Sequence, residues 1–173
     1  MSRAFTKEDD LEHAGIDIPE RPVSQEKNYV TPAGLKELKI ILDNLDKNRK
    51  SLIENEAYKN DQKILRIERD IRYFSSRIKS AILIDPIIQD KELILFSAKV
   101  SVLSIYNKKY QFEIVGEDEA NIKEYKISYL SPLAKLLLGC RVNDEVVWNK
   151  PSGNEKLTIT DIYYCGQTNP NHF

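Results

Sequence analysis

Two consecutive stretches of the sequence repeat apolar residues at alternating steps of three and four, and this pattern strongly restricts how the chain can fold. Apolar residues at this spacing form one narrow stripe along an α-helix, and two such helices bury their stripes by pairing. A polar segment at residues 55–61 separates the two stretches. The sequence therefore predicts an antiparallel coiled-coil hairpin over residues 29–85. Its two seams are Leu35, Leu38, Leu42, Leu45 and Leu52, then Ile64, Ile67, Ile71, Phe74, Ile78 and Ala81.

The expected ends of the hairpin carry helix start and stop signals. Thr31 can cap the first free amides, and Pro32 suits the first helical position because that position needs no amide donor. Pro86 closes the segment. A helix of about 23 residues is ~35 Å long, so the tip should lie well away from the base. A globular helical bundle is the alternative, but one narrow stripe per helix favours the hairpin.

The pattern changes to β-strands after the hairpin. Alternating or apolar runs predict strands at residues 96–106, 110–116, 126–130, 144–149 and 156–164. Ser131 and Pro132 repeat the cap-and-proline helix start, and Gly139 supplies a stop. We therefore expect an α+β protein in which residues 86–166 form an antiparallel sheet with one short helix. Residues 1–28 should form an extended arm and residues 167–173 a tail.

The formal net charge of −1 does not favour free nucleic acid as the main ligand. Residues 31–84 nevertheless hold twelve basic and eight acidic side chains, a local excess of +4. This basic hairpin face could contact phosphates or an acidic protein channel. The alternative is an ordinary solvated helix face. The residues concerned are Lys63, Arg66, Arg69, Arg72 and Arg77.

The sequence contains no catalytic pattern that we can identify. Neither phosphate-binding glycine motif occurs, and the two histidines and two cysteines have no zinc-binding spacing. We therefore expect no catalytic residues, no resident metal or other cofactor, no small-molecule substrate and no enzyme activity. The chain begins without an apolar leader and has no membrane-length apolar run, which predicts a soluble cytoplasmic protein with no membrane partner.

Acidic residues at the predicted hairpin tip are the remaining constellation that could support chemistry. Glu54, Glu56 and Asp61 lie there, with Tyr58 among them. Carboxylates supplied to another protein's active site can complete a magnesium site. The alternative is that a turn in water must be polar, and the composition favours this second interpretation.

Several segments resemble the bacterial transcription elongation factors GreA and GreB, and the resemblance covers roughly residues 29–164. VTPAGLKELKIILDNL (30–45) is similar to the family's opening of the first helix, and SAILID (80–85) to its exit from the second. In the C-terminal half the similar segments follow the family's order: AKVSVL (98–103), IVGEDEA (114–120), ISYLSPLAKLLLG (127–139) and VNDEV (142–146).

The resemblance implies a coiled coil followed by an FKBP-like domain that docks on RNA polymerase at the mouth of its secondary channel. The coiled coil would reach inward, so the partner is the polymerase in its elongation complex, and nucleic acid is contacted indirectly. Carried over by motif, the docking residues are Gly116, Asp118, Glu119, Ser131 and Pro132. Ser131 and Pro132 are also a sound helix start in any protein.

The sequence departs from the cleavage-competent members of this family. Their tip carries an Asp and a Glu three residues apart that hold a magnesium ion, and no such pair occurs between Leu52 and Lys63. The first helix also resembles a version shortened by about two heptads, ~20 Å, as in the Gre-related regulator Rnk. We therefore expect modulation of elongation without efficient transcript cleavage, and magnesium only as an ion of the polymerase active site.

Two alternatives remain open from the sequence. One is a cleavage-stimulating factor that uses the tip carboxylates Glu54, Glu56 or Asp61. The other is an FKBP-like peptidyl-prolyl isomerase or peptide-binding module, which would need an aromatic-lined apolar pocket. Its candidate lining residues are Trp148, Tyr125, Tyr129, Tyr163 and Tyr164.

Overall fold

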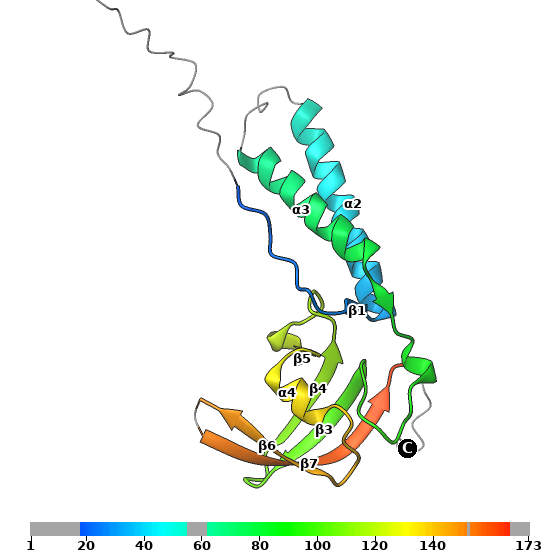
Figure 1. The fold of residues 1–173 in the computed structure, drawn as a ribbon, viewed down its shortest axis with the longest axis vertical. Coiled ribbons are helices and arrows are strands. Elements are labelled where there is room, and N and C mark those ends of the chain that lie inside the picture. Colours follow the sequence, from blue (N-terminus) through cyan, green and yellow to red (C-terminus); the bar gives the residue numbers. More distant parts are fainter. Residues whose placement is uncertain (1–17, 55–61, 152, 167–173) are drawn as a thin grey trace, which may run out of the picture.

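The computed structural model describes residues 18–54, 62–151 and 153–166, and shows a helical hairpin projecting from a curled sheet (Figure 1). Helix α2 is Pro32–Glu54 and helix α3 is Gln62–Lys79. The Thr31 Oγ1 accepts a hydrogen bond from the Gly34 amide at 3.0 Å, which is the predicted N-terminal cap. The α+β fold class predicted from the two periodicities is confirmed.

A five-stranded sheet forms the second part, in the order β5-β4-β3-β7-β6. Strands β3, β4, β7 and β6 pair antiparallel, as predicted, whereas the edge strand β5 pairs parallel with β4, which the sequence did not predict. After β4 the chain turns back along that strand before it pairs again, and β5 therefore runs in the same direction as β4. The strands are β3 (Ala98–Ser104), β4 (Lys109–Val115), β5 (Lys126–Ser128), β6 (Glu145–Lys150) and β7 (Gly153–Tyr164).

The core lies between the sheet and helix α4 (Pro132–Leu137). Alternate residues of β3 point inward, and Val100 and Val102 are buried while their neighbours are half-buried, as a strand with one covered face requires. Leu137 of α4 is fully buried against this face. The Tyr164 hydroxyl donates to the Leu93 carbonyl at 2.6 Å and so ties the end of β7 to the segment that enters β3.

A short parallel ladder closes the base of the hairpin. Strand β1 (Tyr29–Val30) precedes α2, strand β2 (Ile82–Leu83) follows α3, and the two pair directly. The 3₁₀ turn η1 (Pro86–Ile88) then leads toward the sheet, and a second turn, η2 (Ile122–Glu124), precedes β5. The sequence did not predict this ladder, because two-residue strands are too short to show a period.

No helix among the described residues is long and apolar enough to cross a membrane.

Candidate functional site

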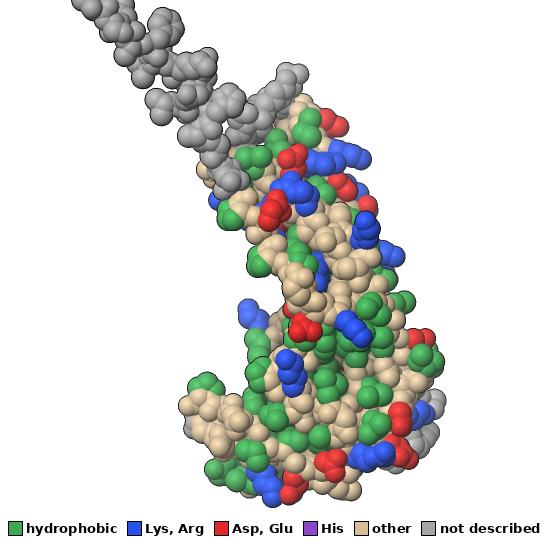
Figure 2. All heavy atoms as spheres, viewed as in Figure 1, with side chains coloured by type: hydrophobic (Ala, Val, Ile, Leu, Met, Phe, Trp, Pro, Cys, Tyr) green, Lys and Arg blue, Asp and Glu red, His purple; other side chains and the backbone are tan. Residues whose placement is uncertain are grey.

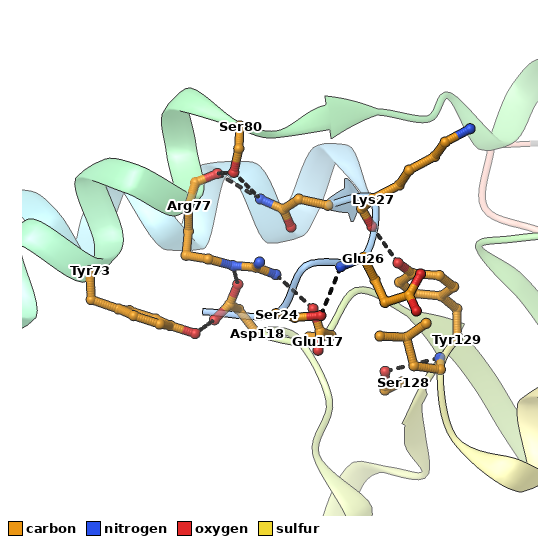
Figure 3. Close-up of polar contacts among 12 residues, drawn as sticks. Ser24, Glu26, Lys27, Tyr73, Arg77, Ser80, Glu117, Asp118, Ser128 and Tyr129 are labelled. Atoms are coloured by element: carbon orange, nitrogen blue, oxygen red, sulfur yellow. Dashed lines mark hydrogen bonds and ion pairs between the residues drawn. The ribbon is translucent and has the colours of Figure 1, made fainter. Parts of the chain in front are cut away.

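The loop that follows β4 faces the base of the hairpin rather than open solvent. Asp118 accepts hydrogen bonds from the Tyr73 hydroxyl at 2.7 Å and from Arg77 Nε at 2.5 Å (Figure 3). Glu117 lies 3.3 Å from the same guanidinium. The Arg77 side chain is 2% exposed and that of Asp118 is 8% exposed. These residues form a buried joint, which we call the hairpin joint, between α3 and the sheet.

The prediction that Arg77 belongs to an exposed basic face is therefore wrong. Its position in the helical repeat resembles that of the exposed arginines, but the acidic loop packs over this last turn of α3 and buries it. Burial alone would lower the pKa of Arg77, but the hydrogen bond and charge of Asp118 outweigh it, and the net shift of the pKa is upward. Arg77 therefore stays charged and paired at the joint.

Glu119, the other acidic residue predicted to dock on a partner, also contacts the base of the hairpin. Glu119 accepts hydrogen bonds from the Thr31 amide at 2.9 Å and from its hydroxyl at 2.5 Å, at the start of α2. An anion at a helix N-terminus is favourable because free amides and the helix dipole both point toward it. A Cβ on Gly34 would lie 1.9 Å from the Glu119 Cδ, and one on Gly116 would lie 2.5 Å from the Tyr29 carbonyl oxygen. Both glycines are needed for this close approach.

A third set of contacts holds the chain that enters the hairpin. The side-chain Nδ2 of Asn28 donates to the Arg77 carbonyl at 2.7 Å and to Ser80 Oγ at 3.1 Å. The Tyr129 hydroxyl donates to the Lys27 carbonyl (Figure 3). Since these bonds reach both α3 and the sheet, the entering chain, the hairpin and the sheet share one polar network.

The pKa of Tyr73 predicts a pH dependence of stability. Burial, followed by the hydrogen bond to Asp118, raises this pKa from 10.0 to about 12. The folded protein keeps the hydroxyl proton where the unfolded chain loses it, so the stabilisation is complete below pH 10.0 and is lost as the pH rises toward 12. Urea denaturation across this range should show a loss of about 2 kcal/mol beyond that of Tyr73→Phe, which lacks the hydroxyl. Parallel curves for the two proteins would contradict this assignment.

Ser131 and Pro132 lie at the same end of the sheet as the hairpin joint. The parallel pairing of Val115 with Ser128 places the exits of β4 and β5 side by side. Ser131 Oγ accepts from the Ala134 amide at 3.2 Å as the cap of α4, and Pro132 is exposed. Of the five predicted docking residues, the structure therefore places Asp118 and Glu119 in internal contacts, with Gly116 beside them, and leaves Pro132 at the surface.

The remaining basic residues of α3 do not form one continuous patch. Arg69 donates to the neighbouring Asp70, and Arg72 pairs with Glu20, while Arg66 is exposed nearer the tip. Figure 2 shows acidic and basic side chains interspersed along the hairpin. The predicted basic face is thus reduced to the half of α3 nearest the tip.

The tip itself lies mostly outside the described residues, and this applies to Glu56, Tyr58 and Asp61. Glu54 is the exposed last residue of α2. Beside it, the two helices border a groove of about 430 Å³. The groove is lined by Asn48, Ser51, Leu52, Lys63, Arg66 and Ile67. Among the described parts of the chain, no cluster of three or more His, Cys, Asp or Glu side chains could hold a metal ion.

The aromatic residues proposed for a peptide pocket do not meet in one place. Trp148 packs edge-on against Tyr110 and Phe112 at ring distances of 5.8 Å. Tyr129 instead packs against Tyr29 at 5.4 Å, and Tyr164 is buried in the core. Tyr163 and Tyr125 lie outside that core. Tyr125 and Tyr163 line a small cavity of about 130 Å³ together with Phe112. The rest of its lining is polar or charged: Lys99, Gln111, Glu113 and Glu124. Trp148, Tyr129 and Tyr164 are not among its lining residues, so the structure does not gather the five predicted aromatic residues into one apolar pocket.

Comparison with known proteins gives a consistent result. Residues 89–164 match the family described as "Transcription elongation factor, GreA/GreB, C-term". The GreB of Neisseria meningitidis serogroup B is 34% identical over 157 residues, covering 82% of this chain and 96% of that protein. The GreA of Francisella philomiragia is 32% identical over 152 residues, covering 78% and 95%.

Solved structures align at lower sequence identity. The Gfh1 protein of Thermus thermophilus is 23% identical, with a TM-score of 0.39 over 80% of this chain and 99% of that one. A GreA/GreB factor from Nitrosomonas europaea is 21% identical, with a TM-score of 0.41 over 80% and 100%.

Proposed function

The chain belongs to the GreA/GreB family of transcription elongation factors, and we propose that it binds RNA polymerase through the sheet and places hairpin α2–α3 in or near the secondary channel. In this proposal the protein modulates elongation and is not itself an enzyme. Its partner is the polymerase in the elongation complex, and nucleic acid is contacted only within that complex. Any magnesium involved belongs to the polymerase.

The hairpin joint is the observation that carries this proposal. A projecting arm can act inside a partner only if its direction is fixed relative to the docking domain. Here the buried Arg77–Asp118 pair, the Tyr73 hydroxyl and the Thr31–Glu119 bonds fix both helices at their base. Beyond the joint, the 23 residues of α2 extend ~35 Å from the sheet. The joint therefore supports a hairpin that keeps a fixed orientation relative to the docking domain.

The tip chemistry supports modulation rather than cleavage. The family's cleavage pair of an Asp and a Glu at three-residue spacing is missing from residues 53–62. A hairpin shorter by ~20 Å would leave its carboxylates far from a metal, whereas catalysis requires placement to within an ångström. Stalled, backtracked complexes incubated with magnesium should release no RNA fragments above the intrinsic rate. Release well above that rate would overturn this part of the proposal.

Polymerase binding is the direct test of the proposal as a whole. The intact chain should bind purified core enzyme or stalled elongation complexes in a native gel. If it binds neither, the proposal fails regardless of what the tip does.

The start of α4 should provide part of the docking surface. Ser131→Asn combined with Pro132→Glu should weaken binding to the polymerase about tenfold, because the contact surface changes while Asn preserves the helix cap. Affinity is measured by titration against labelled core enzyme. Ile105→Glu, at the exposed β3–β4 turn, is the matched control and should leave affinity unchanged. Equal effects of the two variants would exclude α4 as the docking surface.

A further inference from the structure

The described part of the N-terminal arm lies along α3. The Arg21 guanidinium lies 3.9 Å from the centre of the Tyr73 ring and 5.1 Å from that of Phe74, and it approaches Asp70 at 3.7 Å. The neighbouring Glu20 pairs with Arg72. The arm is therefore held by charge complementarity and by cation–π contact with α3.

The arm runs from the base of the hairpin toward its tip. Tyr29 pairs with Ile82, beyond the C-terminal end of α3, whereas Arg21 contacts residues 70–74. The chain of the arm therefore has the same direction as α3, and its N-terminal end lies nearer the hairpin tip (Figure 1). Ile18, the first described residue, is half-buried. The described arm therefore ends on the tip side of its contacts with α3.

The face of α3 that the arm follows continues into the groove near the tip. Arg66, Asp70 and Tyr73 are spaced by four and three residues, so they share one side of the helix. Arg66 lines the groove of about 430 Å³, whose apolar part is formed by Leu52 and Ile67. A ligand for this groove would combine an apolar side chain with negative charge.

Residues 1–17 have this chemistry. They contain five acidic and two basic side chains, a net charge of −3 with histidine neutral. Leu11 lies between Asp10 and Glu12, and Ile16 precedes Asp17. The reach is also sufficient: Arg66 lies seven residues before Tyr73, about 10 Å along the helix, and three or four extended residues before Arg21 span that distance.

We propose that residues 11–17 bind in the groove between α2 and α3, with an apolar side chain against Leu52 and Ile67 and with acidic groups near Arg66. In this arrangement residues 11–17 cover the basic part of the groove, which contains Lys63 and Arg66. The contact is intramolecular and stands independently of polymerase binding.

Paramagnetic relaxation in the isolated protein tests this contact. A nitroxide is attached at Ala14→Cys in a background carrying Cys140→Ser and Cys165→Ser. Amide signals of residues 48–52 and 63–67 should broaden strongly, and Glu12→Gln with Asp17→Asn should at least halve the broadening. High salt should reduce it as well, because the attraction is partly electrostatic.

Two outcomes would overturn the proposal. The first is broadening confined to residues near position 18, which would show that the segment does not reach the groove. The second is equal broadening when labelled protein is mixed with separate isotope-enriched protein, which would show that a second copy occupies the groove. A nitroxide at Thr160→Cys, on the outer face of the sheet, is the matched control and should leave the groove signals unchanged.

Discussion

Replacing Asp118 by alanine is expected to lower the free energy of unfolding by about 3 kcal/mol, because it leaves the Arg77 charge buried without its main partner. The guanidinium is 2% exposed, so water cannot replace the carboxylate without opening the joint. Glu117 remains at 3.3 Å but offers a longer contact. Urea denaturation followed by circular dichroism reports the hairpin helices, and Trp148 fluorescence reports the sheet. The helical transition should move to lower urea than the fluorescence transition.

Two further variants separate the buried pair from a general loss of packing. Arg77→Met combined with Asp118→Ala should be more stable than Asp118→Ala alone, since no unpaired charge remains in the joint. Glu92→Ala removes an ion pair with Arg141 whose side chains are 77% and 54% exposed, and should cost no more than about 0.5 kcal/mol. A double variant less stable than either single variant would rule out the buried charge as the cause.

Gly34→Ala is expected to destabilise the protein by about 1–2 kcal/mol, although alanine is the better helix former. The new Cβ would lie 1.9 Å from the Glu119 Cδ and would displace that side chain. The carboxylate would then lose its bonds to the Thr31 amide and hydroxyl. Thermal and urea denaturation both measure the change.

The sign of this effect should reverse when Glu119 is absent. In a Glu119→Ala background the three atoms nearest to the new Cβ, all from the Glu119 side chain, are absent. Gly34→Ala should then stabilise the protein by up to about 1 kcal/mol through helix propensity. The same loss in both backgrounds would mean that the glycine is needed for another reason. Glu119→Ala alone should cost about 2 kcal/mol, the usual cost of losing charge-assisted bonds at a helix start.

The joint changes how the acidic loop after β4 contributes to the proposed function. Motif similarity indicated that Asp118 and Glu119 contact a partner, but both carboxylates already bind the hairpin base. We therefore propose that they hold the direction of the arm and that the start of α4 makes the outward contact. Variants at the two places should therefore differ: those at the joint change stability, whereas those at Ser131 and Pro132 change affinity.

The sequence by itself determined the helices, most of the strands and the helix caps. Each depends on a period or on a turn residue within a few positions, such as the leucine seam after Thr31 or the Ser131–Pro132 start of α4. The apolar stripes also required the two helices to pair, because neither stripe could be buried otherwise. The fold class followed from these local signals.

Only the tertiary structure decided which charged groups face water. Arg77 has the same spacing as the other arginines of α3, and its partner Asp118 is 41 residues away in the sequence. No local pattern records such a pairing, because it depends on how the sheet packs against the hairpin base. The same is true of Gly34, of the short β1–β2 ladder and of the arm on α3. Periodicity predicts which face of an element is covered, but the identity of the covering residues is a property of the packed molecule.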